Sequence, residues 1–320
     1  MSDPDPVLDL FFGYAGLAHD SGPGHPESPG RLSSLLPLFD RRVRDGRARW
    51  LTAPADPDLS LYRAVHNPEY IDFLEALPTS GFPVPLDGDT QVSHGTVNAL
   101  REVAGVIREI SLPGKPGQTP GKKVFCAVRP PGHHAHFLGG MGFCAVNHVA
   151  LLCARTLLSD PEGKVLILDF DVHHGNGTAD IAGRLFPPDR VLFVSTHRYP
   201  FYPGTGSGQD NRTLPGGAGR LDIPLAAGTD DDDYQAVLED QILPRWDAFS
   251  PDTVLVSAGF DAHLLDPLGD MNLTEKSYER IGRELSGRVR GLTACFLEGG
   301  YNLSALPLSV EAFLSGWGNA

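Results

Sequence analysis

The chain has 320 residues, of which 41% are hydrophobic and 21% are charged, and its formal net charge at neutral pH is −14. This composition provides enough apolar residues for a sizeable core and excludes an intrinsically disordered chain. The negative charge repels the phosphates of nucleic acids, so we expect no direct nucleic acid partner. The same charge attracts cationic substrates, although many proteins are acidic for solubility alone.

The cysteines and the N-terminal residues indicate the cellular compartment of the protein. Four cysteines are present, and none belongs to a C-x-x-C pair. The neighbours of Cys126 and Cys144 are apolar, which predicts buried free thiols in a reducing compartment. Residues 1–10 contain three Asp and no basic residue, the opposite of a secretory signal. Because no apolar run is long enough to span a bilayer, we expect a cytoplasmic protein with no membrane partner. The sequence leaves the oligomeric state open.

The N-terminal third predicts one strand followed by helices. The predicted strand is Val7–Tyr14, and the predicted helices are Pro29–Arg44, with Ser28 as a possible N-cap, Pro68–Leu77 and Ser93–Ile110. The segment Leu112–Lys122 holds three Pro and three Gly, which predicts an exposed loop. A domain linker is the weaker interpretation, because the residues before this loop contain no convincing sheet of their own. We therefore expect a single catalytic domain over residues 1–320.

Stronger strand signals follow the loop and alternate with helical stretches. The predicted strands are Lys123–Val128, Val165–Phe170, Val191–Thr196, Thr253–Ala258 and Thr293–Glu298. The predicted helices are Asn147–Leu158, Gly177–Leu185, Asp231–Trp246 and Thr274–Arg288, with Asp230–Asp233 capping the third of them. Apolar strands that alternate with helices favour an α/β fold, with a central, mostly parallel sheet and helices on both faces.

Polar residues follow several of these strands where the strands end. Asp169, Asp171 and His173 follow one strand, Asp261 another, His133 and His134 a third, and Tyr301 a fourth. Because ligand sites in open parallel sheets lie beyond the carboxyl ends of the strands, these side chains are expected to converge.

Asp171 and His173 are separated by one residue, so both side chains point to the same side of an extended segment. With Asp261 they provide three ligands and leave one coordination position open, which is typical of a catalytic rather than a structural zinc site. Two carboxylates make the donor set hard enough for Fe²⁺ to compete. Asp-x-His alone favours a chance turn with helix-capping carboxylates, and the additional residues favour a metal site.

His133 and His134 follow a stiff Pro-Pro-Gly segment, and Tyr301 follows two glycines. Adjacent histidines point apart on a regular strand, so they suit acid–base catalysis beside a metal better than shared ligation. A phenol at a strand end can donate a hydrogen bond to the oxyanion formed when water attacks an amide. Without the other motifs, exposed loop histidines and a buried core tyrosine would be the simpler interpretations.

These motifs resemble the histone deacetylase family, which has the arginase–deacetylase fold. The resemblance runs from about residue 19 to near the C-terminus. The matching strings are His25-Pro-Glu-Ser-Pro-Gly-Arg31, Arg129-Pro-Pro-Gly-His-His-Ala135, Gly142-Phe-Cys144, Asp169-Phe-Asp-Val-His-His-Gly-Asn-Gly177, Pro203-Gly-Thr-Gly206, Ser257-Ala-Gly-Phe-Asp261 and Glu298-Gly-Gly-Tyr301.

The resemblance implies a role for each matching residue. Asp171, His173 and Asp261 correspond to the zinc ligands. His134 corresponds to the general base, His133 to the neighbouring histidine that assists proton transfer, and Tyr301 to the residue that polarises the carbonyl.

The resemblance also implies a potassium site and a substrate tunnel. Asp169 corresponds to a buried carboxylate that supports His133 and a structural K⁺. The rest of the potassium site comprises the Ser195 hydroxyl and the carbonyls of Asp171, His173 and Thr196. The residues that correspond to the walls and rim of an acyl-lysine tunnel are Gly142, Phe143, Tyr202, Leu268 and Gly299.

Asn176 indicates the branch of the family. The branch that resembles the main nuclear enzymes usually has Asp here, whereas Asn fits the second, class II-like branch, which includes bacterial members. A neutral amide raises the basicity of His134 less than a carboxylate would.

The resemblance implies a zinc-dependent deacetylase of acyl-lysine in proteins or peptides. The nearest alternative is a deacetylase of acetylpolyamines or other acylated small amines, which would use the same metal chemistry. A catalytically inactive acyl-lysine binding module is an alternative of another class, and the presence of every catalytic residue type argues against it. An arginase-like enzyme with two manganese ions needs more bridging carboxylates than these motifs contain.

Overall fold

The computed structural model describes residues 8–79, 82–111, 121–289 and 291–318. Its strands are β1 (Leu8–Phe12), β2 (Ala48–Trp50), β3 (Val84–Pro85), β4 (Gln91–Val92), β5 (Lys123–Ala127), β6 (Val165–Asp169), β7 (Val191–Arg198), β8 (Arg212–Thr213), β9 (Gly219–Leu225), β10 (Thr253–Ala258) and β11 (Thr293–Leu297). Its α-helices are α1 (Pro29–Arg44), α2 (Pro68–Glu75), α3 (His94–Ser111), α4 (His148–Ser159), α5 (Asn176–Leu185), α6 (Asp231–Val237), α7 (Leu243–Phe249), α8 (Glu275–Arg288) and α9 (Ala305–Gly318).

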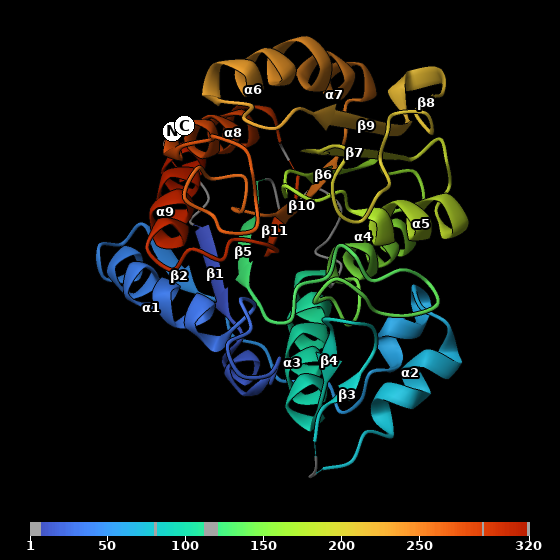
Figure 1. Cartoon of the computed structure of the whole chain (residues 1–320). Helices are drawn as coiled ribbons and strands as arrows, with labels where there is room; N and C mark the ends of the chain where they lie inside the picture. Colours follow the sequence, from blue (N-terminus) through green and yellow to red (C-terminus); the bar gives the residue numbers. More distant parts are fainter. Residues whose placement is uncertain (1–7, 80–81, 112–120, 290, 319–320) are drawn as a thin grey trace.

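One large sheet organises the molecule. Nine of the described strands form it in the order β2-β1-β5-β11-β10-β6-β7-β9-β8 (Figure 1). Every neighbouring pair is parallel except β8 and β9, and the short strands β3 and β4 form a separate antiparallel ribbon. The prediction of a single α/β domain with a mostly parallel sheet is therefore confirmed.

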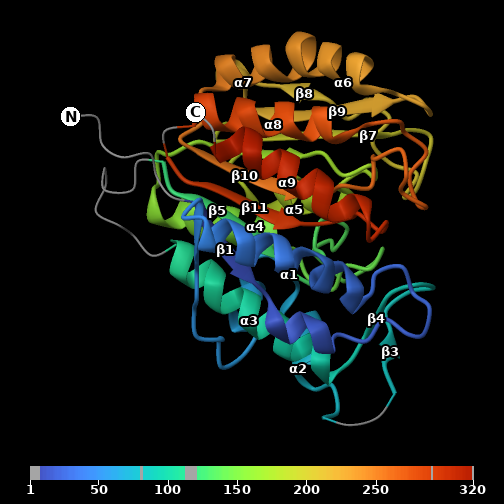
Figure 2. The same cartoon turned by 90° about the vertical axis from the view of Figure 1, so that its left-hand side faces the viewer.

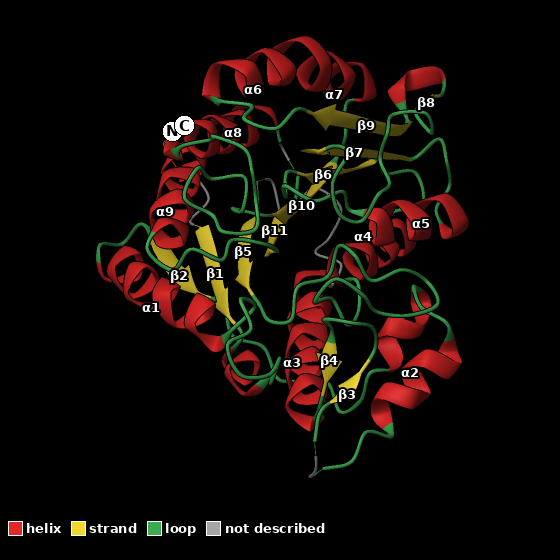
Figure 3. Ribbon diagram, in the orientation of Figure 1, coloured by secondary structure: helices red, strands yellow, loops and turns green. Residues whose placement is uncertain are grey.

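Helices cover both faces of the sheet because the strands are apolar on both sides. Along β6, Leu166 and Leu168 point into one core, whereas Val165 and Ile167 point into the other. The first core also contains residues of α1, α6, α7, α8 and α9, and the second contains residues of α2, α3, α4 and α5. In Figure 3 the strands run between these two groups of helices.

Glycines let α8 and α9 pack closely on the face of the sheet that α1, α6 and α7 also cover (Figure 2). A Cβ atom added to Gly282 would overlap the carbonyl oxygen of Phe313, and one added to Gly316 would overlap that of Glu279. The two helix backbones thus lie against each other, which buries Phe313 and Trp317 at the end of the chain.

Some predicted elements differ from the observed ones. The predicted helix Asp231–Trp246 extends to Phe249 and contains a π-helical turn at Leu238–Ile242. The side chain of Asp230 caps this helix by accepting hydrogen bonds from the amides of Asp232 and Asp233, as predicted. Strand β1 ends at Phe12, two residues before the predicted end, and a 3₁₀ turn begins at Tyr14.

Two predictions fall partly on residues that the structure does not describe. These are Val7 in the first predicted strand and residues 112–120 of the predicted loop. Among the helices that are described, none combines the length and the apolar character needed to cross a membrane.

Candidate active site

The predicted site residues converge at one edge of the sheet. Strands β5, β11, β10 and β6 are neighbours in the sheet, and their carboxyl ends lead into the segments that carry the predicted catalytic and metal-binding side chains. Parallel neighbours end at the same edge, so residues up to 168 positions apart in the sequence meet there, as between His133 and Tyr301.

Asp171, His173 and Asp261 form one cluster. A potential ligand atom from each lies within 4.8 Å of the others. The Nδ1 atom of His173 is 3.1 Å from Oδ1 of Asp171 and 3.2 Å from Oδ2 of Asp261. Both carboxylates are further fixed by the backbone, because Gly299 N donates to Asp171 at 2.7 Å and Val172 N donates to Asp261 at 2.9 Å. The three side chains are therefore held in a defined geometry.

The electrostatics of this cluster suit a divalent cation. Both carboxylates are buried, and burial together with the charge of Asp171 raises the pKa of Asp261 to about 7. Burial disfavours the charged form of His173, but the two carboxylates outweigh it and raise the pKa of that imidazole to about 10. A Cβ atom at Gly259 or Gly299 would overlap these carboxylates, so glycine preserves the space around them. The residues fit a metal ion with two oxygen ligands and one nitrogen ligand.

His133 and His134 lie side by side, with ring centroids 3.9 Å apart, but their surroundings shift their pKa values in opposite directions. Burial alone would keep His133 neutral, yet Asp171 and Asp169 raise its pKa to about 10, and its Nδ1 atom is 3.0 Å from Asp169 Oδ2. Burial and the charges of the neighbouring histidines hold the pKa of His134 well below its usual value. One imidazole is therefore suited to donate a proton, and the other to accept one.

Asn176 orients the neutral histidine. Its Oδ1 atom is 2.7 Å from His134 Nδ1, which therefore donates the proton of this hydrogen bond. The lone pair of His134 then lies on Nε2. Asn176 is the first residue of α5, so the start of this helix places the amide beside His134.

Tyr301 lies at the same edge, beside the metal-site cluster. Its backbone N–H donates to Asp266, and the guanidinium of Arg31 lies 4.9 Å from its ring centroid. Burial holds the pKa of the phenol well above its usual value, although Arg31 opposes this effect. Tyr301 thus remains protonated at neutral pH and is able to donate a hydrogen bond.

A pocket of about 240 Å³ connects these groups to the surface. Its lining comprises Asp89, His134, Gly142, Phe143, His173, Phe201, Tyr202, Leu268 and Tyr301. Four of the five residues expected in a substrate tunnel therefore line one pocket with a candidate base and a candidate oxyanion donor. The fifth, Gly299, contacts Asp171 from behind and is not part of this lining.

Sequence reasoning missed two residues of this pocket. The ring of Phe201 stacks on His173 at a centroid distance of 5.4 Å. Phe201 precedes Tyr202 in an aromatic segment that contains prolines, and this position could have indicated a second aromatic residue of the pocket. Asp89 follows β3 in the turn of the β3–β4 ribbon, and nothing in its local sequence distinguishes it from a solvated turn residue.

The side chains expected at the potassium site belong to β6 and β7, next to the edge of the sheet where the candidate active site lies. Ser195 and Thr196 belong to β7, and Ser195 pairs with Asp169 in the sheet register. The Ser195 hydroxyl is 2.9 Å from His197 Nδ1, and that of Thr196 is 2.9 Å from the Tyr234 hydroxyl. Asp169 itself is fully buried.

A buried ionic network supports the loops around the site, and sequence reasoning assigned no role to its members. Glu27 accepts hydrogen bonds from Arg129 at 2.6 and 2.7 Å and from Arg31 at 3.1 Å, and all three side chains are fully buried. Arg31 also donates to the carbonyl oxygens of Glu298 and Gly300. The network thereby connects the segment before α1 to the segments that carry the candidate catalytic histidines and Tyr301.

Replacing Glu27 with alanine is expected to destabilise the protein by about 3–5 kcal/mol, because it leaves two buried guanidinium groups without their carboxylate. Burial opposes ionisation of Glu27, but Arg129 lowers its pKa to about 2. The stability that Glu27 contributes is therefore complete above its unfolded-state pKa of 4.5 and is lost as the pH falls towards 2. Urea unfolding at neutral pH measures how much free energy of unfolding the alanine variant loses. The matched control is Asp45→Ala, which removes an exposed ion pair with Arg47 and should cost less than about 0.5 kcal/mol.

Comparisons with known proteins identify the family and support the fold. A family model described as "Histone deacetylase domain" matches residues 25–317. A probable deacetylase of Archaeoglobus fulgidus is 34% identical over 322 residues, covering 97% of this chain and 87% of the relative. Histone deacetylase 15 of Arabidopsis thaliana is 35% identical over 298 residues, covering 91% of this chain and 52% of the plant protein. The crystal structure of the HDA15 HD domain matches with a TM-score of 0.87 at 32% identity, covering 98% of this chain and 88% of that chain. The chain belongs to the histone deacetylase family.

Proposed function

We propose that residues 1–320 form a zinc-dependent amidohydrolase that removes acetyl or other acyl groups from the ε-amine of lysine in proteins or peptides. The observation that carries the proposal is the cluster of Asp171, His173 and Asp261 beside a pocket that His134 and Tyr301 line. Zinc held by these ligands would polarise the acyl carbonyl and lower the pKa of a water molecule. Fe²⁺ is the alternative ion, because two of the three ligands are carboxylates.

The two histidines divide the proton transfers between them. His134 is neutral and accepts a proton from the attacking water through Nε2, while Asn176 fixes its orientation. Burial opposes the charged form of His133, but Asp171 and Asp169 raise its pKa to about 10, so His133 is placed to give a proton to the departing amine. The opposite pKa shifts of these neighbours support the assignment of one base and one acid.

Tyr301 stabilises the charge that develops on the carbonyl oxygen. Its phenol is protonated and shares the pocket with His134, so it can donate a hydrogen bond as the oxyanion forms. The contacts of Arg31 with the Tyr301 ring and with the Gly300 carbonyl hold this part of the chain in place.

The pocket walls favour a narrow, linear chain. Phe143 lies edge-on to Tyr301, with ring centroids 5.8 Å apart, and Tyr202 lies edge-on to His134 at 5.3 Å. Gly142 and Leu268 complete the walls, and Gly299 leaves room for the metal-binding carboxylates. Aromatic rings can enclose the methylene groups of a lysine side chain, because they bury a large apolar area in close contact with it.

We further propose that a structural K⁺ binds below the metal site. Its ligands would be Asp169, the Ser195 hydroxyl and the carbonyl oxygens of Asp171, His173 and Thr196. The burial of Asp169, Ser195 and Thr196 beneath the catalytic segment supports this assignment.

Asp89 favours a second candidate substrate, an acylated polyamine or another small cationic amine. It lies in the pocket lining, and the chain as a whole carries a charge of −14. A carboxylate there would attract a second ammonium group of a short substrate.

A substrate panel tests the proposal. Zinc-loaded protein is offered acetyl-lysine peptides, acetylspermidine and a small acetylated monoamine, each with acyl chains of several lengths, and kcat/KM is measured. We expect the highest values for a lysine peptide, together with inhibition by a hydroxamate that binds zinc. Preference for acetylspermidine would select the second candidate, and no hydrolysis of any substrate by zinc-replete protein would overturn the proposed function.

A further inference from the structure

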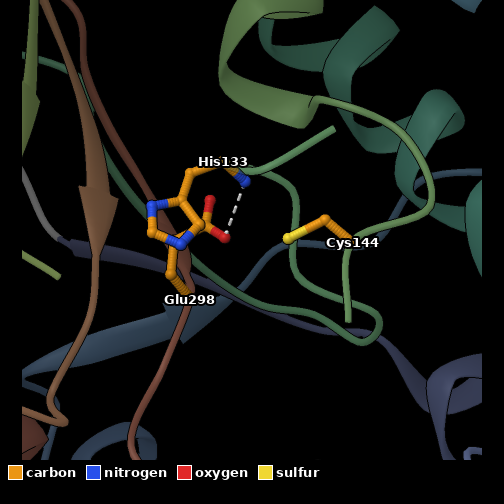
Figure 4. A group of neighbouring side chains, drawn as sticks. All are labelled: His133, Cys144 and Glu298. Atoms are coloured by element: carbon orange, nitrogen blue, oxygen red, sulfur yellow. Dashed lines mark hydrogen bonds between the residues drawn. The ribbon is translucent and has the colours of Figure 1, made fainter. Parts of the chain in front are cut away.

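A second group of potential metal ligands includes His133, one of the two proposed catalytic histidines. His133 comes from the segment after β5, Cys144 from the loop before α4, and Glu298 from the position directly after β11 (Figure 4). A ligand atom from each lies within 4.8 Å of the others. All three are at most 3% exposed. They share no residue with the cluster of Asp171, His173 and Asp261.

One carboxylate oxygen of Glu298 accepts hydrogen bonds, and the other has no partner among the described residues. Its Oε2 atom accepts hydrogen bonds from the amides of Gly132 at 2.7 Å and His133 at 3.0 Å. Its Oε1 atom has no hydrogen-bond partner among the described residues. Leaving a buried carboxylate oxygen unsatisfied is costly, so such an atom indicates a bound water molecule or ion.

One ring nitrogen of His133 is paired with a carboxylate, and the other faces the second cluster. Its Nδ1 atom pairs with Asp169 at 3.0 Å, which leaves Nε2 as the ligand atom. A carboxylate on the far nitrogen is the arrangement that commonly orients metal-binding imidazoles. The Nε2 atom is 3.8 Å from Asp171 Oδ1, so the second cluster directly adjoins the first.

Cys144 decides which ions would bind. Its Sγ atom is held beside the histidines by accepting a hydrogen bond from the backbone N–H of His134 at 3.4 Å. Thiolate, imidazole and carboxylate together suit Zn²⁺ and Co²⁺, whereas Mg²⁺ and Ca²⁺ prefer oxygen ligands alone.

We propose that His133, Cys144 and Glu298 form a second binding site for a thiophilic divalent cation, and that its occupation inhibits the enzyme. An ion that binds Nε2 of His133 displaces the proton that this atom would otherwise give to the leaving amine. Binding at this site is independent of the proposed function, and only the inhibition rests on it. The experiment therefore measures the two separately.

The binding experiment uses protein carrying one equivalent of zinc, to which Co²⁺ is added. A thiolate bound to Co²⁺ gives a charge-transfer band in the near ultraviolet, whereas the carboxylates and imidazole of the first cluster do not. We expect the band to grow with Co²⁺ in the wild type, and also in zinc-free Asp261→Ala, because that variant loses a ligand of the first site and keeps all three ligands of the second site. We expect it to be absent in Cys144→Ala and present in Cys153→Ala, which removes a buried thiol from α4.

A second variant guards against a loss of folding in Cys144→Ala. Glu298→Gln can still accept hydrogen bonds from the Gly132 and His133 amides but loses the negative charge. We expect it to weaken Co²⁺ binding at least about tenfold, as removing groups around a metal commonly does. A wild-type protein without the band, or a band equally strong in Cys144→Ala, would overturn the proposal and leave a water molecule as the partner of Glu298.

The inhibition experiment follows acetyl-peptide hydrolysis as free zinc rises above one equivalent. Each variant is normalised to its own activity at one equivalent. We expect wild type and Cys153→Ala to lose activity at excess zinc, and Cys144→Ala to need at least about tenfold more zinc for the same loss. Equal sensitivity of both cysteine variants would refute the inhibitory role even if a second ion binds.

Discussion

Asp261→Ala is expected to abolish zinc retention and, with it, the hydrolysis of acyl-lysine peptides. The Oδ2 atom of Asp261 is 3.2 Å from His173 Nδ1, and no other carboxylate reaches the same cluster from β10 within the described residues. Removing a residue that merely orients a metal ligand already costs about 10–100-fold in metal affinity. We therefore expect the loss of a direct ligand to exceed about 100-fold.

The zinc content of dialysed protein and kcat/KM on the same samples measure this effect. Asp270→Ala is the matched control, because Asp270 lies nearby in the chain but is exposed and pairs with Arg198 at the surface. The control should retain stoichiometric zinc. Near-stoichiometric zinc in Asp261→Ala would remove Asp261 from the ligand set, and circular dichroism of the zinc-free proteins separates metal loss from unfolding.

The central sheet could be predicted because its strands are buried on both faces. Strands such as Val165–Asp169 and Thr253–Ala258 are mostly apolar and lead into a polar residue or a glycine, so the sequence marks both the strand and the edge where ligands gather. The candidate metal cluster followed from the same signal, since Asp171, His173 and Asp261 lie just past those ends.

Elements with weaker local signals were not predicted. Strand β2 has three residues, and β9 contains a proline and two charged residues, so neither shows a clear strand pattern. Helix α9 is apolar around most of its circumference because α1 and α8 cover it, and it therefore lacks the one-sided pattern of a surface helix.

Contacts between distant segments were also outside the reach of sequence reasoning. Glu27 and Arg129 are 102 positions apart, and only the fold shows that they form a buried pair. Asp89 reaches the pocket because the β3–β4 ribbon folds over it, and the Thr90 hydroxyl accepts a hydrogen bond from the Phe143 amide at 2.9 Å. Local patterns carry no information about such pairings.

Tyr301→Phe is expected to lower kcat by about 10²–10³, the usual effect of removing one oxyanion donor. The substitution keeps the ring that packs near Phe143 and beneath Arg31, and it deletes only the hydroxyl. Because this hydrogen bond strengthens only as the oxyanion forms, kcat and kcat/KM should fall together while KM and zinc content change little. The matched control is Tyr199→Phe, which removes a phenol hydroxyl outside the pocket lining and should leave kcat near the wild-type value.

The same variant separates an enzyme from an inactive acyl-lysine binding module. A module would bind the acyl-lysine peptide without turnover, and Tyr301→Phe would change only its affinity. The pH profile adds a second criterion. Because the pKa of Tyr301 is held well above its usual value, the phenol stays protonated throughout the neutral range, so the residual activity of the variant should keep the wild-type pH profile. Turnover close to wild type would exclude Tyr301 as the oxyanion donor, and a changed profile would mean that the phenol takes part in proton transfer.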